Sequence, residues 1–280
     1  MGHNAYTFHQ AKTLDYFLYL IVGALAGFLS GLFGLGGGVI IVPVLIFMFT
    51  ASNLSIEVVT HLAIGTSLAT IAITSITSAL THHQKGAVRW DLIRWIVPGI
   101  VFGSVIGGLV AASLAGYVLQ LLFGCLLVVV SAQLFLSPEF KAVPTPGRFF
   151  LGLAGTFIGS VSALFGIGGG TLTTPFLTRI GVKIRQAVGS AAACGLPIAV
   201  AGGLTYLVAG QGNSALPEGS LGYIYIPAWI GIVLASIPFA RLGALVAHLL
   251  NEQILRRLFA AVILLLGIRF IWINALISLG

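Results

Sequence analysis

The chain has 280 residues, of which 58% are apolar and only 7% are charged, and its formal net charge is +7. A soluble domain carries about 25% charged residues, so these few charges cannot cover a water-soluble surface, and most of the surface must face lipid. The basic residues are scattered through short loops, which excludes a nucleic-acid-binding stripe, and the 2 cysteines lie inside apolar segments, which excludes a disulfide framework.

The chain contains a series of apolar runs long enough to cross a membrane as helices of about 20 residues. A secretory signal before the first run, suggested by Lys12 and a small-residue site, is disfavoured because the apolar run continues past that site. The sequence therefore predicts a polytopic all-α membrane protein. The predicted spans are 14–35, 57–81, 91–112, 116–136, 148–167, 186–209, 222–247 and 254–278, with two shorter apolar pieces at 39–50 and 171–180.

The two short apolar pieces each follow a run of three glycines, and the two glycine runs are copies of one another. Residues 33–38 read Phe-Gly-Leu-Gly-Gly-Gly and residues 165–170 read Phe-Gly-Ile-Gly-Gly-Gly, an offset of 132 residues (165 − 33), which also pairs Pro43 with Pro175. The chain is thus a duplication. We predict a first membrane repeat at 14–136, a cytoplasmic linker at 137–147 and a second membrane repeat at 148–278.

The distribution of basic residues predicts that the two repeats have opposite orientations. The connection at 85–94 is basic in the first repeat, whereas its counterpart at 211–221 has no basic residue, and the bias is reversed at 51–56 and 179–185. Short cytoplasmic loops are enriched in Lys and Arg, so this reversal is typical of inverted repeats. Each repeat then needs an odd number of crossings. We predict a glycine-broken, V-shaped or re-entrant helix plus three spanning helices in each repeat, with both termini outside.

The triple glycines are the most specific feature of the sequence. Exposed backbone amides in hydrocarbon are tolerated only where protein or water surrounds them, and a broken helix directs its free N–H groups and positive dipole end at an anion. Tight helix packing is the alternative, and we assign it to the four-residue spacing of Gly99, Gly103 and Gly107. The glycines predicted to bind substrate are Gly36, Gly37, Gly38, Gly168, Gly169 and Gly170.

These motifs resemble the TauE/SafE family of membrane transporters, sometimes described as sulfite exporters. The resemblance rests on residues 32–38 with Pro43, on their near copies at 164–170 with Pro175, and it covers the chain from about 14 to 270. It implies transport of sulfite, thiosulfate, sulfonates or related small organosulfur anions across the bacterial inner membrane. It does not identify the individual substrate.

Hydroxyl side chains gather on the same elements as the glycines. They offer neutral donors to an oxyanion without the desolvation cost of a buried cation, although hydroxyls in membrane helices often bond to their own helix or a neighbour. Thr173 and Thr174 align with Ile41 and Val42, so a site that uses them is not symmetric between the repeats. The predicted hydroxyl ligands are Ser30, Ser162, Thr66, Ser67, Ser190, Thr171, Thr173 and Thr174.

Three ionisable side chains within or near the spans are candidates for a charge role. His61 lies one turn before Gly65 and aligns with Arg185 at the related position of the second repeat, which suggests a proton or anion role for the pair; an interfacial location is the alternative. Arg269 is either a functional charge or a side chain that reaches the interface beside Trp272. His82 and His83 favour an interfacial face over a metal site.

The sequence thus predicts a secondary transporter that moves a small anion by alternating access. A nucleotide-binding Gly-x4-Gly-Lys-Ser/Thr loop is absent from the sequence, so the driving force is a proton gradient, another ion gradient or the substrate gradient. The expected partners are the anion and the lipid bilayer, with no nucleic acid, cofactor or metal. An anion channel is the first alternative. An intramembrane enzyme is the second, and it is disfavoured because Asp and Glu are nearly absent from the spans.

Overall fold

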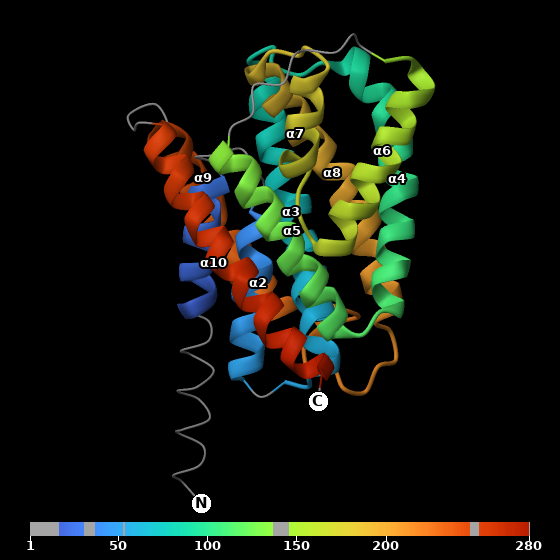
Figure 1. Ribbon diagram of the computed structural model, residues 1–280, viewed down its shortest axis with the longest axis vertical. Coiled ribbons are helices and arrows are strands. Elements are labelled where there is room, and N and C mark those ends of the chain that lie inside the picture. The colour runs from blue at the N-terminus through green and yellow to red at the C-terminus, as the bar shows by residue number, and fades with distance from the viewer. Residues whose placement is uncertain (1–16, 31–36, 53, 137–145, 247–251, 280) are drawn as a thin grey trace, which may run out of the picture.

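The structure is a computed structural model that describes residues 17–30, 37–52, 54–136, 146–246 and 252–279. It is mostly helical, with one short β-hairpin (Figure 1). After an N-terminal helix at Phe17–Ser30 come α2 (Gly38–Ala51), α3 (Ile56–Gln84), α4 (Trp90–Ser113), α5 (Gly116–Leu136), α6 (Arg148–Phe165), α7 (Gly170–Arg179), α8 (Ile184–Ala209), β1 (Ser220–Leu221), β2 (Ile224–Tyr225), α9 (Ile226–Val246) and α10 (Glu252–Leu279).

Five of the described helices, α3, α4, α5, α6 and α8, are long and apolar enough to cross a membrane. Within the described residues, shorter apolar helices lie at Phe17–Ser30, Gly38–Ala51, Ile226–Leu242 and Ala260–Ala275. The helices fall where the apolar runs predict them, because the bilayer requires long segments in which every backbone polar group is paired internally. The exception is the start of the span predicted at 222–247, where β2 precedes α9 and the helix begins at Ile226. The chain is therefore a multi-pass helical membrane protein.

The short helix α7 is too short to cross a bilayer and follows a break in the chain after α6. Figure 1 shows α6 running from the top of the molecule to about mid-height, α7 returning to the top, and α8 then crossing to the bottom. The α6–α7 pair thus begins and ends at the same end of the molecule. The first glycine break, between the N-terminal helix and α2, lies largely outside the described residues.

Helices from the two halves of the chain are paired through glycines. Gly103 of α4 lies against Thr156 of α6, and Gly107 against Ser160, whose hydroxyl donates to the Gly103 carbonyl at 3.0 Å. Residue numbers rise together on both helices, so the two run parallel. A Cβ at either glycine would collide with the facing backbone carbonyl, which confirms that the spacing at 99, 103 and 107 is a packing motif.

The N-terminal helix and α9 form a second pair of this kind. Gly23 faces the backbone of Ile232 and Gly27 faces the backbone of Ser236, again with residue numbers that rise together. The first helix of each half therefore packs in parallel against a helix of the other half. These two helix pairs join the two halves of the chain into one body.

The helices α5 and α10 pack against each other in opposite directions. Gly124 lies beside Gly267, and the hydroxyl of Ser131 donates to the Ala260 carbonyl at 2.8 Å. The long helices α3 and α8 also cross the molecule in opposite directions and lie at its centre (Figure 1). The remaining described helices surround this central pair or the α5–α10 pair.

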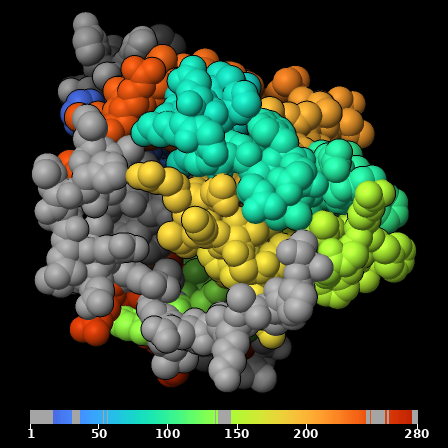
Figure 2. Space-filling view, turned by 90° about the horizontal axis from the view of Figure 1, so that it is seen from above, coloured from blue at the N-terminus to red at the C-terminus, as the bar shows by residue number. Residues whose placement is uncertain are grey.

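The top of the molecule carries the basic connections. Figure 2 shows this end face, on which the α3–α4 connection, the start of α6 and the α7–α8 connection occupy neighbouring areas. These segments contain Lys85, Arg89, Arg148, Lys183 and Arg185. The opposite end carries the α4–α5 connection, the β-hairpin and the end of α10 (Figure 1).

Candidate functional site

Glycine at position 166 ends α6 and creates the second break. Gly166 has a φ of +66°, a left-handed conformation that residues with a Cβ rarely adopt. The N–H of Ile167 donates back to the Ser162 carbonyl at 3.0 Å, which closes the last turn of α6. The chain then continues through three buried glycines into α7, so the N-terminal end of α7 lies inside the protein.

The buried start of α7 is an electropositive end. The first N–H groups of a helix have no carbonyl partner within that helix, and the helix dipole adds a partial positive charge there. The first intrahelical bond here runs from the Thr173 N–H to the Gly169 carbonyl at 2.9 Å. Acidic residues are absent from the first turn of α7. The local field thus favours an anion.

Three hydroxyls around this helix start lack a hydrogen-bond partner within the described part of the chain. They are Ser162 Oγ, one turn before the break, and Thr173 Oγ1 and Thr174 Oγ1 in the first turns of α7. Ser162 and Thr173 are each 0% exposed. A buried hydroxyl left unpaired costs about 1–3 kcal/mol, and most such groups in proteins are paired. These three side chains are therefore the strongest ligand candidates in the site.

The start of α2, where the first glycine run ends, lies against the second break. Gly38, the first residue of α2, packs on the backbone of Gly166 and Ile167. The hydroxyl of Ser67 on α3 donates to the Gly166 carbonyl at 2.8 Å and so fixes the second break. Gly37 caps α2 and is also buried. Gly36 lies outside the described residues.

The packing around each break does not leave all glycines free for a ligand. A Cβ at Gly169 would collide with the Ala191 carbonyl on α8, so this glycine has a packing role of its own. At Gly37 the three nearest described atoms to a new Cβ would be in the Ile41 side chain at 3.1 Å, the Ala26 carbonyl at 3.5 Å and the Ala26 side chain at 3.7 Å. A methyl group therefore fits more easily at Gly37, where the closest neighbour is the end of a side chain, than at Gly169, where it is backbone.

Three of the predicted hydroxyl ligands bond to backbone groups: Ser67 donates to the Gly166 carbonyl, and Thr66 and Ser190 accept backbone N–H groups. Thr66 Oγ1 accepts the N–H of Tyr225 at 2.9 Å, and Ser190 Oγ accepts the N–H of Arg89 at the same distance. Thr66 also donates to the Leu62 carbonyl at 2.6 Å. Each hydroxyl fixes the segment that leads into a following helix. Their role as substrate ligands stays a prediction.

The remaining predicted hydroxyls differ in their surroundings. Thr171 is buried in the first turn of α7 and has an interaction partner. Ser30, at the end of the N-terminal helix, is half-buried. Ser30 occupies the position that corresponds to Ser162, so each break carries a serine near the end of the preceding helix.

The three charge candidates lie in different environments. His61 is 4% exposed, with Nε2 at 3.0 Å from the Ala111 carbonyl and Nδ1 at 3.2 Å from the Glu57 carbonyl. Arg185 is exposed at the start of α8. Arg269 is exposed on α10, with its guanidinium 5.3 Å from the centre of the Phe47 ring. In the described part of the chain, His, Cys, Asp and Glu form no group suited to a metal ion.

A polar network between helices is a feature that the sequence reasoning missed. Gln120 on α5 donates to Thr60 Oγ1 on α3 at 2.7 Å, and Asn274 on α10 donates to Gln120 Oε1 at 3.2 Å. Amide side chains inside apolar spans are the signal that could have revealed it. The network ties the bottom ends of α3, α5 and α10 together.

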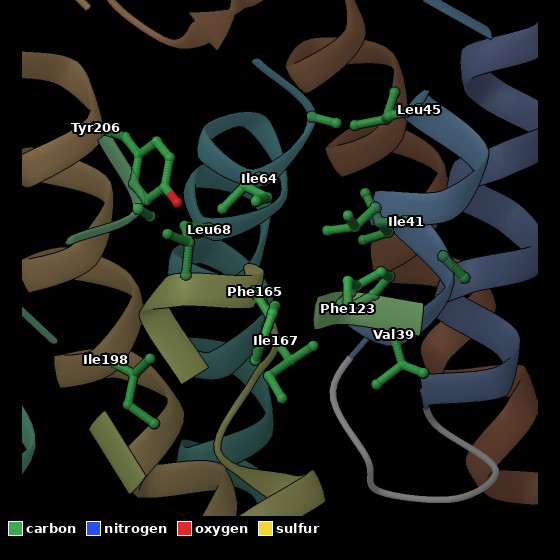
Figure 3. Packing of buried hydrophobic residues seen from close by; sticks show 14 of the residues in the cluster. Val39, Ile41, Leu45, Ile64, Leu68, Phe123, Phe165, Ile167, Ile198 and Tyr206 are labelled. Atoms are coloured by element: carbon green, nitrogen blue, oxygen red, sulfur yellow. The ribbon is translucent and has the colours of Figure 1, made fainter. Parts of the chain in front are cut away.

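Apolar side chains surround the second break. Figure 3 shows Phe165 and Ile167 between the α3 residues Ile64 and Leu68 on one side and Phe123 on the other. The Phe123 and Phe165 rings lie 5.7 Å apart. An apolar groove of about 930 Å³ lies elsewhere, along α4 and α8. The described side chains around the second break are thus mostly apolar, apart from its hydroxyl groups.

The chain is similar to known membrane proteins over most of its length. Residues 19–270 match the family model described as Sulfite exporter TauE/SafE. A probable membrane transporter protein from Haemophilus influenzae is 40% identical over 90% of this chain and 96% of its own length. A probable membrane transporter protein from Methanocaldococcus jannaschii is 29% identical over 90% of this chain and 93% of its own length. No solved structure matches the chain.

Proposed function

Because the chain belongs to the sulfite exporter TauE/SafE family of membrane transporters, we propose that it is a secondary transporter of a small sulfur-containing anion. Sulfite, thiosulfate and small sulfonates are the substrate class, the bacterial inner membrane is the location, and alternating access is the mechanism. The observation that carries the proposal is the group of three unpartnered buried hydroxyls, Ser162, Thr173 and Thr174, around the buried start of α7 in the described part of the chain. The family and its relatives are transporters and not enzymes.

The chemistry of this helix start suits an oxyanion of sulfur. The sulfur-bound oxygens of such an anion accept several hydrogen bonds at once, which hydroxyls and helix N–H groups can donate. Neutral donors bind a charge without leaving an uncompensated cation in the empty site. A transporter must also release its substrate, and donors without a counter-ion allow binding that is weak enough for release.

The two halves of the chain are, in this proposal, inverted repeats. The offset of 136 residues that aligns α5 with α10 places Gly124 on Ala260 and Ser131 on Gly267. The contact of Gly124 with Gly267 is therefore equivalent, under that alignment, to the contact of Ala260 with Ser131. Equivalent helices that run in opposite directions are related by a two-fold axis across the bundle, which supports inversion.

Two hydrogen bonds from backbone N–H groups to hydroxyls of α3 and α8 also support inverted repeats. Thr66 and Ser190 are equivalent by an offset of 124 (190 − 66), and Arg89 and Tyr225 by an offset of 136 (225 − 89). The Tyr225 N–H bonds to Thr66 and the Arg89 N–H bonds to Ser190, both at 2.9 Å. A chance resemblance of sequence would not reproduce the same bond at both ends of the molecule.

Orientation in the membrane follows from the charged end face. The α3–α4 connection, the start of α6 and the α7–α8 connection all carry basic residues and all lie at the top (Figure 2). Cytoplasmic loops are enriched in Lys and Arg, so the top faces the cytoplasm. The end of α10 lies at the bottom (Figure 1), and the C-terminus is accordingly outside. The N-terminus shares that side in an inverted arrangement.

The test is a pair of measurements on the purified full-length protein. A thermal-shift screen should show stabilisation by sulfite, thiosulfate and sulfoacetate, and none by the neutral analogue dimethyl sulfone. Equal stabilisation by the neutral sulfone would contradict an anion site. Liposomes loaded with unlabelled thiosulfate should then accumulate labelled thiosulfate by counterflow, which a carrier supports and a channel does not. Saturable counterflow excludes the channel alternative.

A further inference from the structure

His61 is a buried titratable side chain whose two ring nitrogens both face carbonyl oxygens. The Ala111 carbonyl at the end of α4 lies 3.0 Å from Nε2, and the Glu57 carbonyl one turn earlier on α3 lies 3.2 Å from Nδ1. A neutral imidazole has one N–H and one lone pair, whereas an imidazolium has two N–H donors. Only the protonated ring can donate to both carbonyls. In the neutral ring one nitrogen lone pair always faces an oxygen lone pair.

The ring also stacks on an aromatic face. The centres of the His61 and Tyr223 rings lie 5.1 Å apart with an angle of 30° between their planes. Tyr206 on α8 packs behind Tyr223 with ring centres 6.3 Å apart. An aromatic face attracts a cation, so the stack can also contact an imidazolium.

The surroundings offer no carboxylate in contact with His61 among the described residues. Glu57 contributes its backbone carbonyl and its side chain is exposed. The other titratable groups that the structure describes on neighbouring elements at this end are Tyr117 at the start of α5, Tyr206 on α8, and Glu218, Tyr223 and Tyr225 in the connection before α9. Among the described residues, the groups that contact His61 are therefore carbonyl dipoles and an aromatic ring and not an acid.

The segment of α3 that starts at His61 leads directly to the second glycine break. Gly65 packs on the Tyr223 carbonyl, and Ser67 donates to the Gly166 carbonyl at 2.8 Å. Six residues of α-helix separate His61 from Ser67, a rise of about 9 Å. A charge on His61 is thus close enough to act on an anion at the break, on the order of tenfold in affinity at an effective dielectric constant of about 20.

We propose that His61 is the proton-binding site that couples anion movement to a proton gradient. This inference rests on the proposed anion transport and adds the coupling ion to it. The proton binds at the imidazole nitrogen that faces a carbonyl without an N–H, and its departure returns the ring to the neutral form. At the equivalent position of the second half stands Arg185, whose charge is fixed. The titratable member of the pair is therefore in the first half.

The experiment uses the full-length protein in liposomes with labelled thiosulfate. In the wild-type protein, an imposed pH gradient should drive accumulation, and counterflow should occur without any gradient. H61Q keeps a polar side chain but cannot take up a proton. We expect it to lose gradient-driven accumulation at least tenfold while counterflow at saturating thiosulfate continues. The matched control is H82Q, a histidine at the other end of the same helix, which should retain both activities.

The outcomes separate the two proposals. Absence of wild-type counterflow with every sulfur anion tested would contradict anion transport itself. Normal counterflow together with gradient-driven accumulation in H61Q would overturn the role of His61. If H61Q loses both activities, H61R decides: counterflow that no longer responds to pH supports proton coupling at this position, and a normal pH response in H61R contradicts it.

Discussion

Replacing Thr173 by valine should change stability and ligand binding in opposite directions. The side chain is 0% exposed, and its Oγ1 has no partner among the described residues. Valine has nearly the same shape without the hydroxyl. Removing an unpaired buried hydroxyl relieves a cost of about 1–3 kcal/mol, so substrate-free Thr173→Val should unfold at a higher temperature than the wild-type protein. The same change removes a donor to the anion and should weaken binding by about 5-fold to 150-fold.

The matched control is the same substitution at Thr66. This side chain is also 0% exposed, but its oxygen accepts the Tyr225 N–H and its hydroxyl donates to the Leu62 carbonyl. Valine there removes the oxygen that accepts the part-buried Tyr225 N–H. Thr66→Val should therefore lose about 1–3 kcal/mol of stability. Opposite signs for one chemical change at two equally buried positions cannot come from hydrophobicity alone.

Unfolding can be followed with a thiol-reactive dye, because Cys194 is buried and reacts only when the protein opens, in a background where the exposed Cys125 is replaced by alanine. Each variant is heated with and without thiosulfate. The reasoning is refuted if Thr173→Val unfolds at a lower temperature than the wild-type protein and retains the full thiosulfate shift. That result would mean that the hydroxyl has a structural partner and does not contact the anion.

Three further experiments test the glycine contacts, the Ser190 hydrogen bond and the membrane orientation. Gly103→Ala should prevent recovery of monodisperse protein, because the new Cβ meets the Thr156 carbonyl, whereas Gly37→Ala should purify normally and lose ligand-induced stabilisation. Normal stabilisation of Gly37→Ala by thiosulfate would mean that the first glycine run does not contact the anion. Ser190→Ala should cost about 1–3 kcal/mol by leaving the Arg89 N–H unpaired, measured by thermal unfolding, with an unchanged melting temperature as the contrary result. A phosphatase reporter fused to the C-terminus should be active and a fluorescent reporter dark, because the C-terminus is proposed to lie outside. Bright fluorescence would show that the C-terminus lies in the cytoplasm.

The positions of the helices could be read from the sequence because the bilayer imposes its own length on them. The run predicted at 91–112 is the helix Trp90–Ser113, and the glycine spacing on it predicts its packing face. The break at Gly166 was also predictable, since closely spaced glycines weaken a helix at the point where they occur. These features depend on local pattern, which the sequence displays directly.

The roles of individual hydroxyls could not be read in the same way. Thr66 and Ser190 look like Ser162 in sequence, yet the first two bind backbone N–H groups more than 100 residues away in the chain and the third has no partner among the described residues. Local spacing carries no information about such distant partners. The same applies to Gly169, whose contact with α8 depends on how the break folds back. The sequence therefore predicts a larger set of ligands than the geometry favours.

The glycine-mediated pairing of helices across the two halves has a consequence for how the protein is made. A nascent chain enters the membrane from its N-terminus. The glycine face of α4 has no partner until α6 is inserted, and Gly23 must wait for Ile232, a separation of 209 residues (232 − 23). The glycine faces of α4 and of the N-terminal helix thus become buried only against helices of the second half. Two halves expressed separately should assemble only when both are present, and the smallest unit that matures is the whole chain.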